Sequence, residues 1–230
     1  MPPSWFLQDI NRFPRAQDIY GRNLQVVSVF DEINRNADAK AFSALMEHLR
    51  KTDMKENTVI MVQVENEPGI RKMLRDYSQK ANSAFHEQVP TQLMNFLVKE
   101  KDNLVPGFRL IWMKNGFKTS GSWEEIFDVR APEVFMSWYV AKYINYISKS
   151  GKDKYNLPTY ANAWLPDTDE HIPGQYPSGG PVYDMIPVWQ AAAPDIDMFA
   201  PDIYRPDFKP VCDRYILMGN PLFYTRGQAR

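Results

Sequence analysis

Residues 58–69 read TVIMVQVENEPG, an apolar run that ends in the polar and charged side chains of Gln63, Glu65, Asn66 and Glu67. A continuous run of aliphatic residues is typical of a parallel strand covered on both faces, whereas carboxylates are costly to bury. The run therefore predicts a strand that starts in the core and ends at an opening. Because successive side chains of a strand alternate between its faces, the spacing places Gln63, Glu65 and Glu67 on one face and Asn66 on the other.

Helix-like and strand-like segments alternate along the rest of the chain. Helical spacing of apolar residues begins at Asp38 and again at Pro132, in PEVFMSWYVAKYINYISKSGK. Further strands are predicted at 157–165 and 196–204, and PLFY, from Pro221, is interpreted as the start of a fourth. This alternation is typical of the α/β class with a parallel sheet.

The organisation along the chain indicates one domain over residues 1–230. Residues 1–36 are rich in proline, asparagine and arginine and are expected to form a long loop. Residues 70–156 carry the helical patterns between the first and second predicted strands, and we expect them to form a helical insertion between strands.

Three predicted strands end in side chains suited to binding a polyol. The second ends in Asn162 and Trp164, and the third ends in Asp202 and Tyr204, so that carboxylate, amide and aromatic groups recur at these ends. Polar residues at the carboxyl ends of successive parallel strands are the pattern of a (β/α)8 barrel mouth, where active sites of that fold lie. The pattern therefore predicts a sugar-binding mouth.

Several segments resemble a known family. QVENEPG is similar to the strand-four signature of retaining β-galactosidases of glycoside hydrolase families 35 and 42, and the similarity extends to a bacterial branch of these proteins through RFPRAQ, NRNADAKAFSALMEHLR, NAWL, PSGGP and APDIYRPDF. The resemblance implies hydrolysis of terminal β-D-galactosides. It also implies that the chain corresponds to a partial (β/α)8 TIM barrel, roughly strands four to seven with their helices.

The resemblance assigns roles to individual residues. It implies that Glu67 is the general acid/base and that Asn66 hydrogen-bonds the sugar hydroxyl next to the reacting carbon. The pKa of such an acid/base must lie near neutrality, because it donates a proton to the leaving oxygen and later accepts one from water.

Further candidates for substrate binding are Glu65, Asn162, Trp164 and Tyr204. Each has a plainer interpretation: Glu65 as a structural ion pair, and Trp164 and Tyr204 as core aromatics. The plainer interpretation of Glu67 is an exposed carboxylate at a strand end.

The second carboxylate of a retaining mechanism is missing from the expected place. In the resembling family it is a glutamate just after a segment like GNPLF, but here the text is GNPLFYTRGQAR and no acidic residue follows Asp213. We therefore expect little or no double-displacement activity from this chain. Two alternatives stay open: a non-catalytic carbohydrate-binding or scaffold protein, and an inverting hydrolase that pairs Glu67 with Asp202.

The composition limits the classes of partner that the chain is expected to bind. The net charge of −1, with 27 basic residues scattered among 28 acidic ones, argues against nucleic acid. The lone Cys212 and three dispersed histidines predict no metal, and no cofactor is expected. We expect an oligosaccharide or galactoside as the partner, no membrane, and possible self-association through open sheet edges. The first residues lack the pattern of a signal peptide, although members of the resembling family are often exported, and the localisation stays open.

Overall fold

The computed structural model describes residues 3–166, 172–204, 206, 208–224 and 226–227. These residues form helices and strands, with three short 3₁₀ turns among them at Asp128–Arg130, Tyr183–Met185 and Leu217–Gly219. In chain order the elements are α1 (Ser4–Gln8), β1 (Arg15–Gln17), β2 (Asn23–Val27), α2 (Glu32–Asp53), β3 (Val62–Glu65), α3 (Gln79–Phe85), α4 (Thr91–Lys99), α5 (Pro106–Met113), α6 (Trp123–Phe127), α7 (Ala131–Lys152), β4 (Thr159–Ala163), α8 (Ile186–Ala192), β5 (Met198–Ile203), α9 (Phe208–Tyr215) and β6 (Arg226–Gly227).

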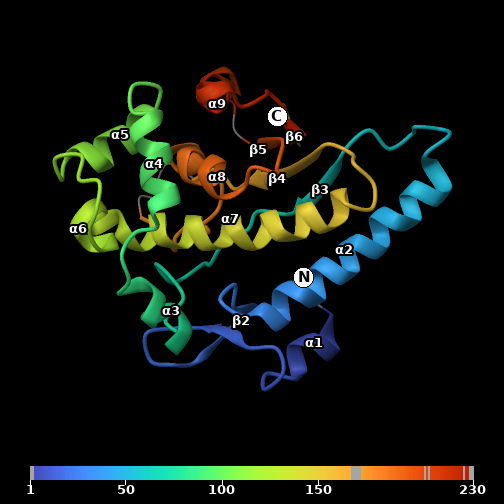
Figure 1. The fold of residues 1–230 in the computed structure, drawn as a ribbon, viewed down its shortest axis with the longest axis horizontal. Coiled ribbons are helices and arrows are strands. Elements are labelled where there is room, and N and C mark those ends of the chain that lie inside the picture. The colour runs from blue at the N-terminus through green and yellow to red at the C-terminus, as the bar shows by residue number, and fades with distance from the viewer. Residues whose placement is uncertain (1–2, 167–171, 205, 207, 225, 228–230) are drawn as a thin grey trace.

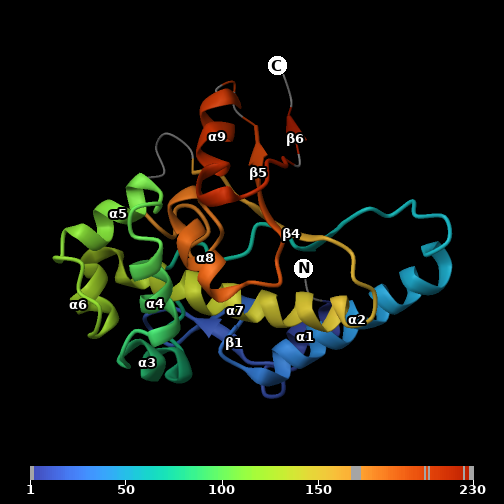
Figure 2. The same cartoon turned by 45° about the horizontal axis from the view of Figure 1, so that its top comes forward.

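The long helix α7 crosses the middle of the molecule (Figure 1). Pro132 in its first turn lacks an N–H that a helix start would leave unpaired, and Lys149 and Lys152 in its last turn favour the negative end of the helix dipole. Most of its side chains are buried. Helix α2 and the N-terminal elements lie on one side of α7, and the strands β3–β5 with α8 and α9 lie on the other (Figures 1 and 2).

Helices α3–α6 gather at one end of α7 and enclose an aromatic core. Helix α6 begins with a capping box, in which the Ser122 side chain accepts from the Glu125 N–H and the Glu125 side chain accepts from the Ser122 N–H. Trp112, Trp123 and Trp138 are each about 1% exposed. The segment predicted as a helical insertion, 70–156, therefore contributes much of the hydrophobic core.

The parallel sheet is small and open. Strands β3, β4 and β5 lie side by side in that order, and the two-residue β6 extends the sheet beyond β5. The prediction of a partial (β/α)8 barrel, roughly strands four to seven with their helices, is wrong. The described residues form this short parallel sheet and a separate antiparallel pair, β1–β2. Five helices, α3–α7, lie between β3 and β4, and of these α4 packs against α8 and α5 against the Tyr183–Met185 turn, whereas a barrel wall has a single crossover helix between successive strands.

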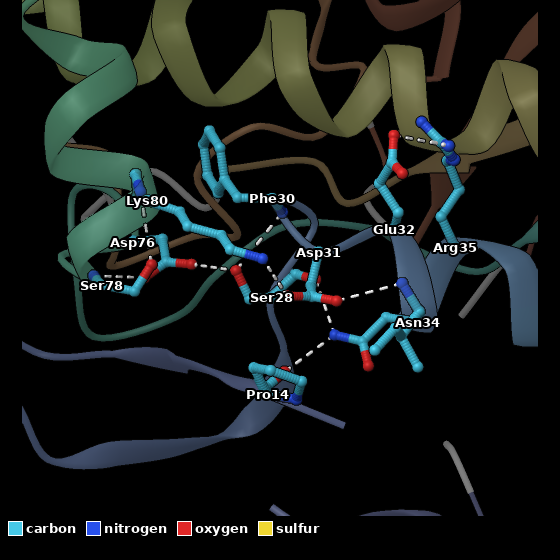
Figure 3. A network of polar contacts seen from close by, with 12 residues as sticks. Pro14, Ser28, Phe30, Asp31, Glu32, Asn34, Arg35, Asp76, Ser78 and Lys80 are labelled. Carbon is cyan, nitrogen blue, oxygen red and sulfur yellow. Dashed lines mark hydrogen bonds and ion pairs between the residues drawn. The ribbon is translucent and has the colours of Figure 1, made fainter. Parts of the chain in front are cut away.

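The N-terminal residues are more ordered than the predicted long loop over 1–36, because that range contains α1, β1, β2 and the start of α2. Buried polar contacts hold this segment (Figure 3). The Asp76 carboxylate accepts from the Ser28 hydroxyl at 2.6 Å and from the Ser78 N–H at 2.7 Å. Lys80 forms an ion pair with Asp31. These contacts connect the first 31 residues to the chain that follows β3.

Three of the predicted strands are found with shorter bounds, as β3, β4 and β5, while PLFY precedes β6 instead of starting it. Helix α2 begins at Glu32, earlier than predicted, because the Asp31 side chain caps it by accepting from the Ile33 N–H at 3.0 Å.

Within the described residues, no helix combines the length and the apolar character needed to cross a membrane.

The contact of Gly151 on α7 with α2 gives a stability prediction. A Cβ atom on Gly151 would lie 2.3 Å from a Phe42 ring carbon and 3.0 Å from Met46 Cγ. Gly151→Ala should therefore lower the free energy of unfolding by about 2 kcal/mol, since overpacking outweighs the better helix propensity of alanine. Urea unfolding measures this change. The neighbouring Ser150→Ala, at a half-buried site where the hydroxyl donates to the Tyr146 carbonyl of the same helix, is the matched control and should change the stability by less than about 1 kcal/mol; equal stabilities of the two variants would contradict the packing.

Candidate active site

A hollow of about 470 Å³ opens at the carboxyl ends of β3, β4 and β5. Ligands of open parallel sheets usually bind at this end of the strands. Polar groups from the three strand ends and aromatic rings from the segment before β6 line it: Gln63, Asn66, Glu67, Tyr160, Asn162, Asp202, Tyr204, Phe223 and Tyr224.

A β-bulge in β3 decides which side chains enter the hollow. The pairing of β3 with β4 shifts between Gln63 and Glu65, because Gln63 pairs with Tyr160 and Glu65 with Ala161. The extra residue brings Asn66 to the side of Gln63, whose Nε2 donates to Asn66 Oδ1 at 3.1 Å. The predicted alternation, with Gln63, Glu65 and Glu67 on one face and Asn66 on the other, is therefore wrong.

Glu65 lies apart from the other candidate residues. It is exposed and does not line the hollow. The charge of Asp38 on α2 acts on the Glu65 carboxyl, and the charge of Glu65 acts in turn on the hydroxyl of Tyr143 on α7. The structure thus places Glu65 beside the α2–α7 pair instead of with Glu67.

Asn162 is the hydrogen-bonding centre of the site. Its Oδ1 accepts from the backbone N–H of Glu67 at 2.7 Å and from Gln63 Nε2 at 3.1 Å. Its Nδ2 donates to Asn66 Oδ1 at 3.1 Å and, more weakly, to Asp202 Oδ2 at 3.5 Å. The side chain is 1% exposed. One buried amide therefore joins the ends of β3, β4 and β5.

Glu67 and Asp202 form a carboxyl pair. Burial raises the pKa of Glu67 to about 7, and the hydrogen bond and negative charge of Asp202 add to the effect, while Arg71 opposes it. Because like charges in contact repel each other, Asp202 favours the protonated form of Glu67. Glu67 also adopts a left-handed backbone with φ of 44°, which is uncommon outside glycine and concentrates at functional sites.

The two predicted aromatic residues differ in position. Tyr204 lines the hollow and is 54% exposed, so the interpretation as a core residue does not hold for it. Trp164 is half-buried and stacks with Arg71, whose guanidinium lies 4.6 Å from the ring centroid. Because Arg71 acts electrostatically on Glu67, Trp164 lies at the border of the site.

Gln63, expected among the polar side chains at the end of the first strand, lines the hollow, but sequence reasoning missed three other lining residues: Tyr160, Phe223 and Tyr224. Tyr160 lies two positions before Asn162, so strand alternation could have identified it. Its ring meets Phe223 edge to face at 5.0 Å, and burial, with the charge of Asp202, raises the pKa of its hydroxyl. Phe223 and Tyr224 had no strand-end signal, because they precede β6.

In the described part of the chain, no cluster of three or more histidine, cysteine, aspartate or glutamate residues could hold a metal ion. Comparison with protein-family models and with curated proteins finds no match to the chain.

Asp202→Asn tests the carboxyl pair. The amide removes the negative charge beside Glu67, so the pKa of Glu67 should fall by roughly one unit, while the burial that contributes most keeps it above the ordinary value. Carbon-13 NMR titration of the glutamate carboxyls measures the change. Asp213→Asn makes the same charge change on the exposed side of α9 and is the matched control. An unchanged pKa in Asp202→Asn would show that the two carboxyls do not interact.

Proposed function

We propose that the hollow binds a terminal β-D-galactoside and that Glu67 is the general acid/base of a glycoside hydrolase of the retaining type. The observation that carries this proposal is the environment of Glu67. Its carboxyl has a pKa of about 7 and lies in an open hollow lined by amides and aromatic rings. An acid with that pKa holds a proton at neutral pH and can also release it.

The proton chemistry assigned to Glu67 has two steps. As the glycosidic bond breaks, the protonated carboxyl gives its proton to the leaving oxygen, which departs as an alcohol. The resulting carboxylate then accepts a proton from the water that attacks in the second step. Asp202, in contact with Glu67, favours the protonated form before the first step because it adds negative charge.

The remaining groups fit a sugar. Asn66 Oδ1 already accepts from Gln63 and Asn162, so Asn66 offers a ligand its Nδ2 as a donor, in keeping with the hydroxyl contact that the family resemblance implies. The rings of Tyr204 and Tyr224 border the hollow and are about half exposed. Exposed aromatic faces suit the apolar face of a galactose ring.

The second carboxylate is the part of the mechanism that this hollow does not contribute. Among its described lining residues the carboxylic acids are Glu67 and Asp202, and these are in hydrogen-bond contact. A nucleophile would lie about 5–5.5 Å from the acid, and an inverting base about 6.5–9.5 Å. The contact argues against Asp202 as an inverting base. It supports the second candidate function, a non-catalytic carbohydrate-binding protein.

An external nucleophile distinguishes the two candidates. With phenyl β-D-galactoside and azide, azide attacks the anomeric carbon, the glycosidic C–O bond breaks, and the proton of Glu67 passes to the phenol oxygen. We expect turnover near background without azide and phenol release with it. The azide-dependent rate should fall as pH rises above about 7, because the acid form of Glu67 is then lost. Chromatography of phenol and galactosyl azide measures the reaction.

Glu67→Gln is the matched variant, since it keeps the shape and removes the proton donor, and it should abolish the azide-dependent rate while galactoside binding persists. Binding without azide-dependent phenol release in the unaltered chain would support the binding protein and overturn the acid/base assignment. Absence of galactoside binding by titration calorimetry would overturn both.

Tyr224→Ala tests the aromatic border. Loss of a stacking ring should weaken galactoside binding by about fivefold, or about 1 kcal/mol, without changing the pKa of Glu67. Calorimetric titration with a galactoside measures the affinity. Tyr20→Ala removes another exposed tyrosine, 74% exposed in the turn between β1 and β2, and should leave binding unchanged. Equal affinities of the two variants would remove Tyr224 from the binding surface.

A further inference from the structure

Asn162 has no hydrogen-bonding capacity left for a ligand. A side-chain amide offers two N–H donors and two oxygen lone pairs. The oxygen of Asn162 accepts from Glu67 N and Gln63 Nε2, and its nitrogen donates to Asn66 Oδ1 and Asp202 Oδ2. With 1% of its surface exposed, its role differs from the predicted substrate binding.

We propose that Asn162 is a positioning residue that holds Glu67 in its left-handed backbone conformation and keeps its carboxyl in contact with Asp202. The catalytic meaning of this role rests on the proposed function of Glu67. The proposal itself concerns the arrangement of the two carboxyl groups, which exists without a ligand.

The backbone of Glu67 depends on support from a neighbouring strand. A left-handed conformation is strained for a residue with a Cβ atom and persists only where contacts compensate. The shortest hydrogen bond of the Asn162 side chain, 2.7 Å, goes to the N–H of Glu67. Because the Glu67 N–H donates to this buried acceptor, the direction in which the chain leaves β3 is fixed.

The Asn162 side chain also contacts both members of the carboxyl pair, Glu67 and Asp202. Asn162 reaches Glu67 through its oxygen and Asp202 through its nitrogen. Because β4 lies between β3 and β5, a residue on β4 is placed to fix the separation of groups on its two neighbours. Mutual repulsion would otherwise drive the carboxyls apart when both ionise. Among the described residues, Arg71 opposes the raised pKa of Glu67, and the charge of Asp202 also acts on the hydroxyl of Tyr160.

Two substitutions of Asn162 should have different effects on the pKa of Glu67. Asn162→Ala removes the acceptor for the Glu67 N–H, so the carboxyls separate and the pKa of Glu67 falls from about 7 toward the ordinary glutamate range. Asn162→Asp keeps an acceptor at that position and adds negative charge, so the pKa of Glu67 should stay at about 7 or rise. Carbon-13 NMR titration of the carboxyls of the unliganded chain measures both.

Asn220→Ala is the matched control. Asn220 is a buried asparagine, 5% exposed, whose amide clamps the backbone of β5 through the N–H and carbonyl of Phe199. Its loss should lower the melting temperature and leave the pKa of Glu67 at the value of the unaltered chain. A pKa that moves equally in Asn220→Ala and Asn162→Ala would show general loosening and overturn the positioning role.

Other results also overturn the proposal. A folded Asn162→Ala variant with the pKa of Glu67 still near 7 would do so. If Asn162→Ala does not fold, a fall of the Glu67 pKa in Asn162→Asp would contradict the proposal equally. The outcome is separable from that of the proposed function, because the titration uses no sugar: altered pKa values without galactoside binding would leave the positioning role standing and remove only the glycosidase assignment.

Discussion

The packing of α7 against its neighbours is the constraint on which the rest of the structure depends. This helix is buried on most sides and separates α2 and the N-terminal elements from the sheet. Its last turns also fix the starts of two strands: the Ser148 hydroxyl donates to the carbonyl oxygen of Asp195 at 3.0 Å, and Lys152 Nζ lies 2.6 Å from Asp197 Oδ2. The Asp197 carboxylate in turn accepts from the Thr159 N–H at 2.6 Å. The amino ends of β4 and β5 are thereby held to α7.

The two ends of the sheet therefore differ in how they treat carboxylates. At the amino ends, carboxylates are paired with cations and backbone N–H groups, so that the pKa of Asp197 is lowered although burial acts against it. At the carboxyl ends, Glu67 and Asp202 meet each other, and the pKa of Glu67 is raised. The pairing at the amino ends stabilises the ionised carboxylates, whereas the contact at the carboxyl ends disfavours ionisation of Glu67. A fold that tolerates this contact needs the rigidity of the pairing, because an unsupported strand end would let the like charges move apart.

Local chemistry explains how much of the fold could be predicted from sequence. The helical periodicity from Pro132 and the apolar strands predicted α7, β3, β4 and β5, since both signals depend on neighbouring residues. The barrel could not be tested at that level, because closure depends on how strands pair in space and on where the helices between them pack. The ends of α2 and the order within residues 1–36 were missed for a similar reason: Asp76 holds Ser28 across 48 positions of sequence, a contact that no local pattern reveals.

The candidate site also shows where prediction from local sequence fails, here through the register of a single residue. Strand alternation assumes an unbroken register, yet the bulge between Gln63 and Glu65 removes Glu65 from the hollow and brings Asn66 into it. The polar residue types at the strand ends were predictable, but the contacts between them were not, because they depend on this register shift. Without the bulge, Asn66 would lie on the other face of β3 and could not accept from Asn162 Nδ2. That nitrogen would then keep only the weaker hydrogen bond to Asp202 Oδ2. The irregularity of β3 is therefore what completes the buried amide network, and that network is what brings a glutamate with a pKa near neutrality to the open end of the sheet.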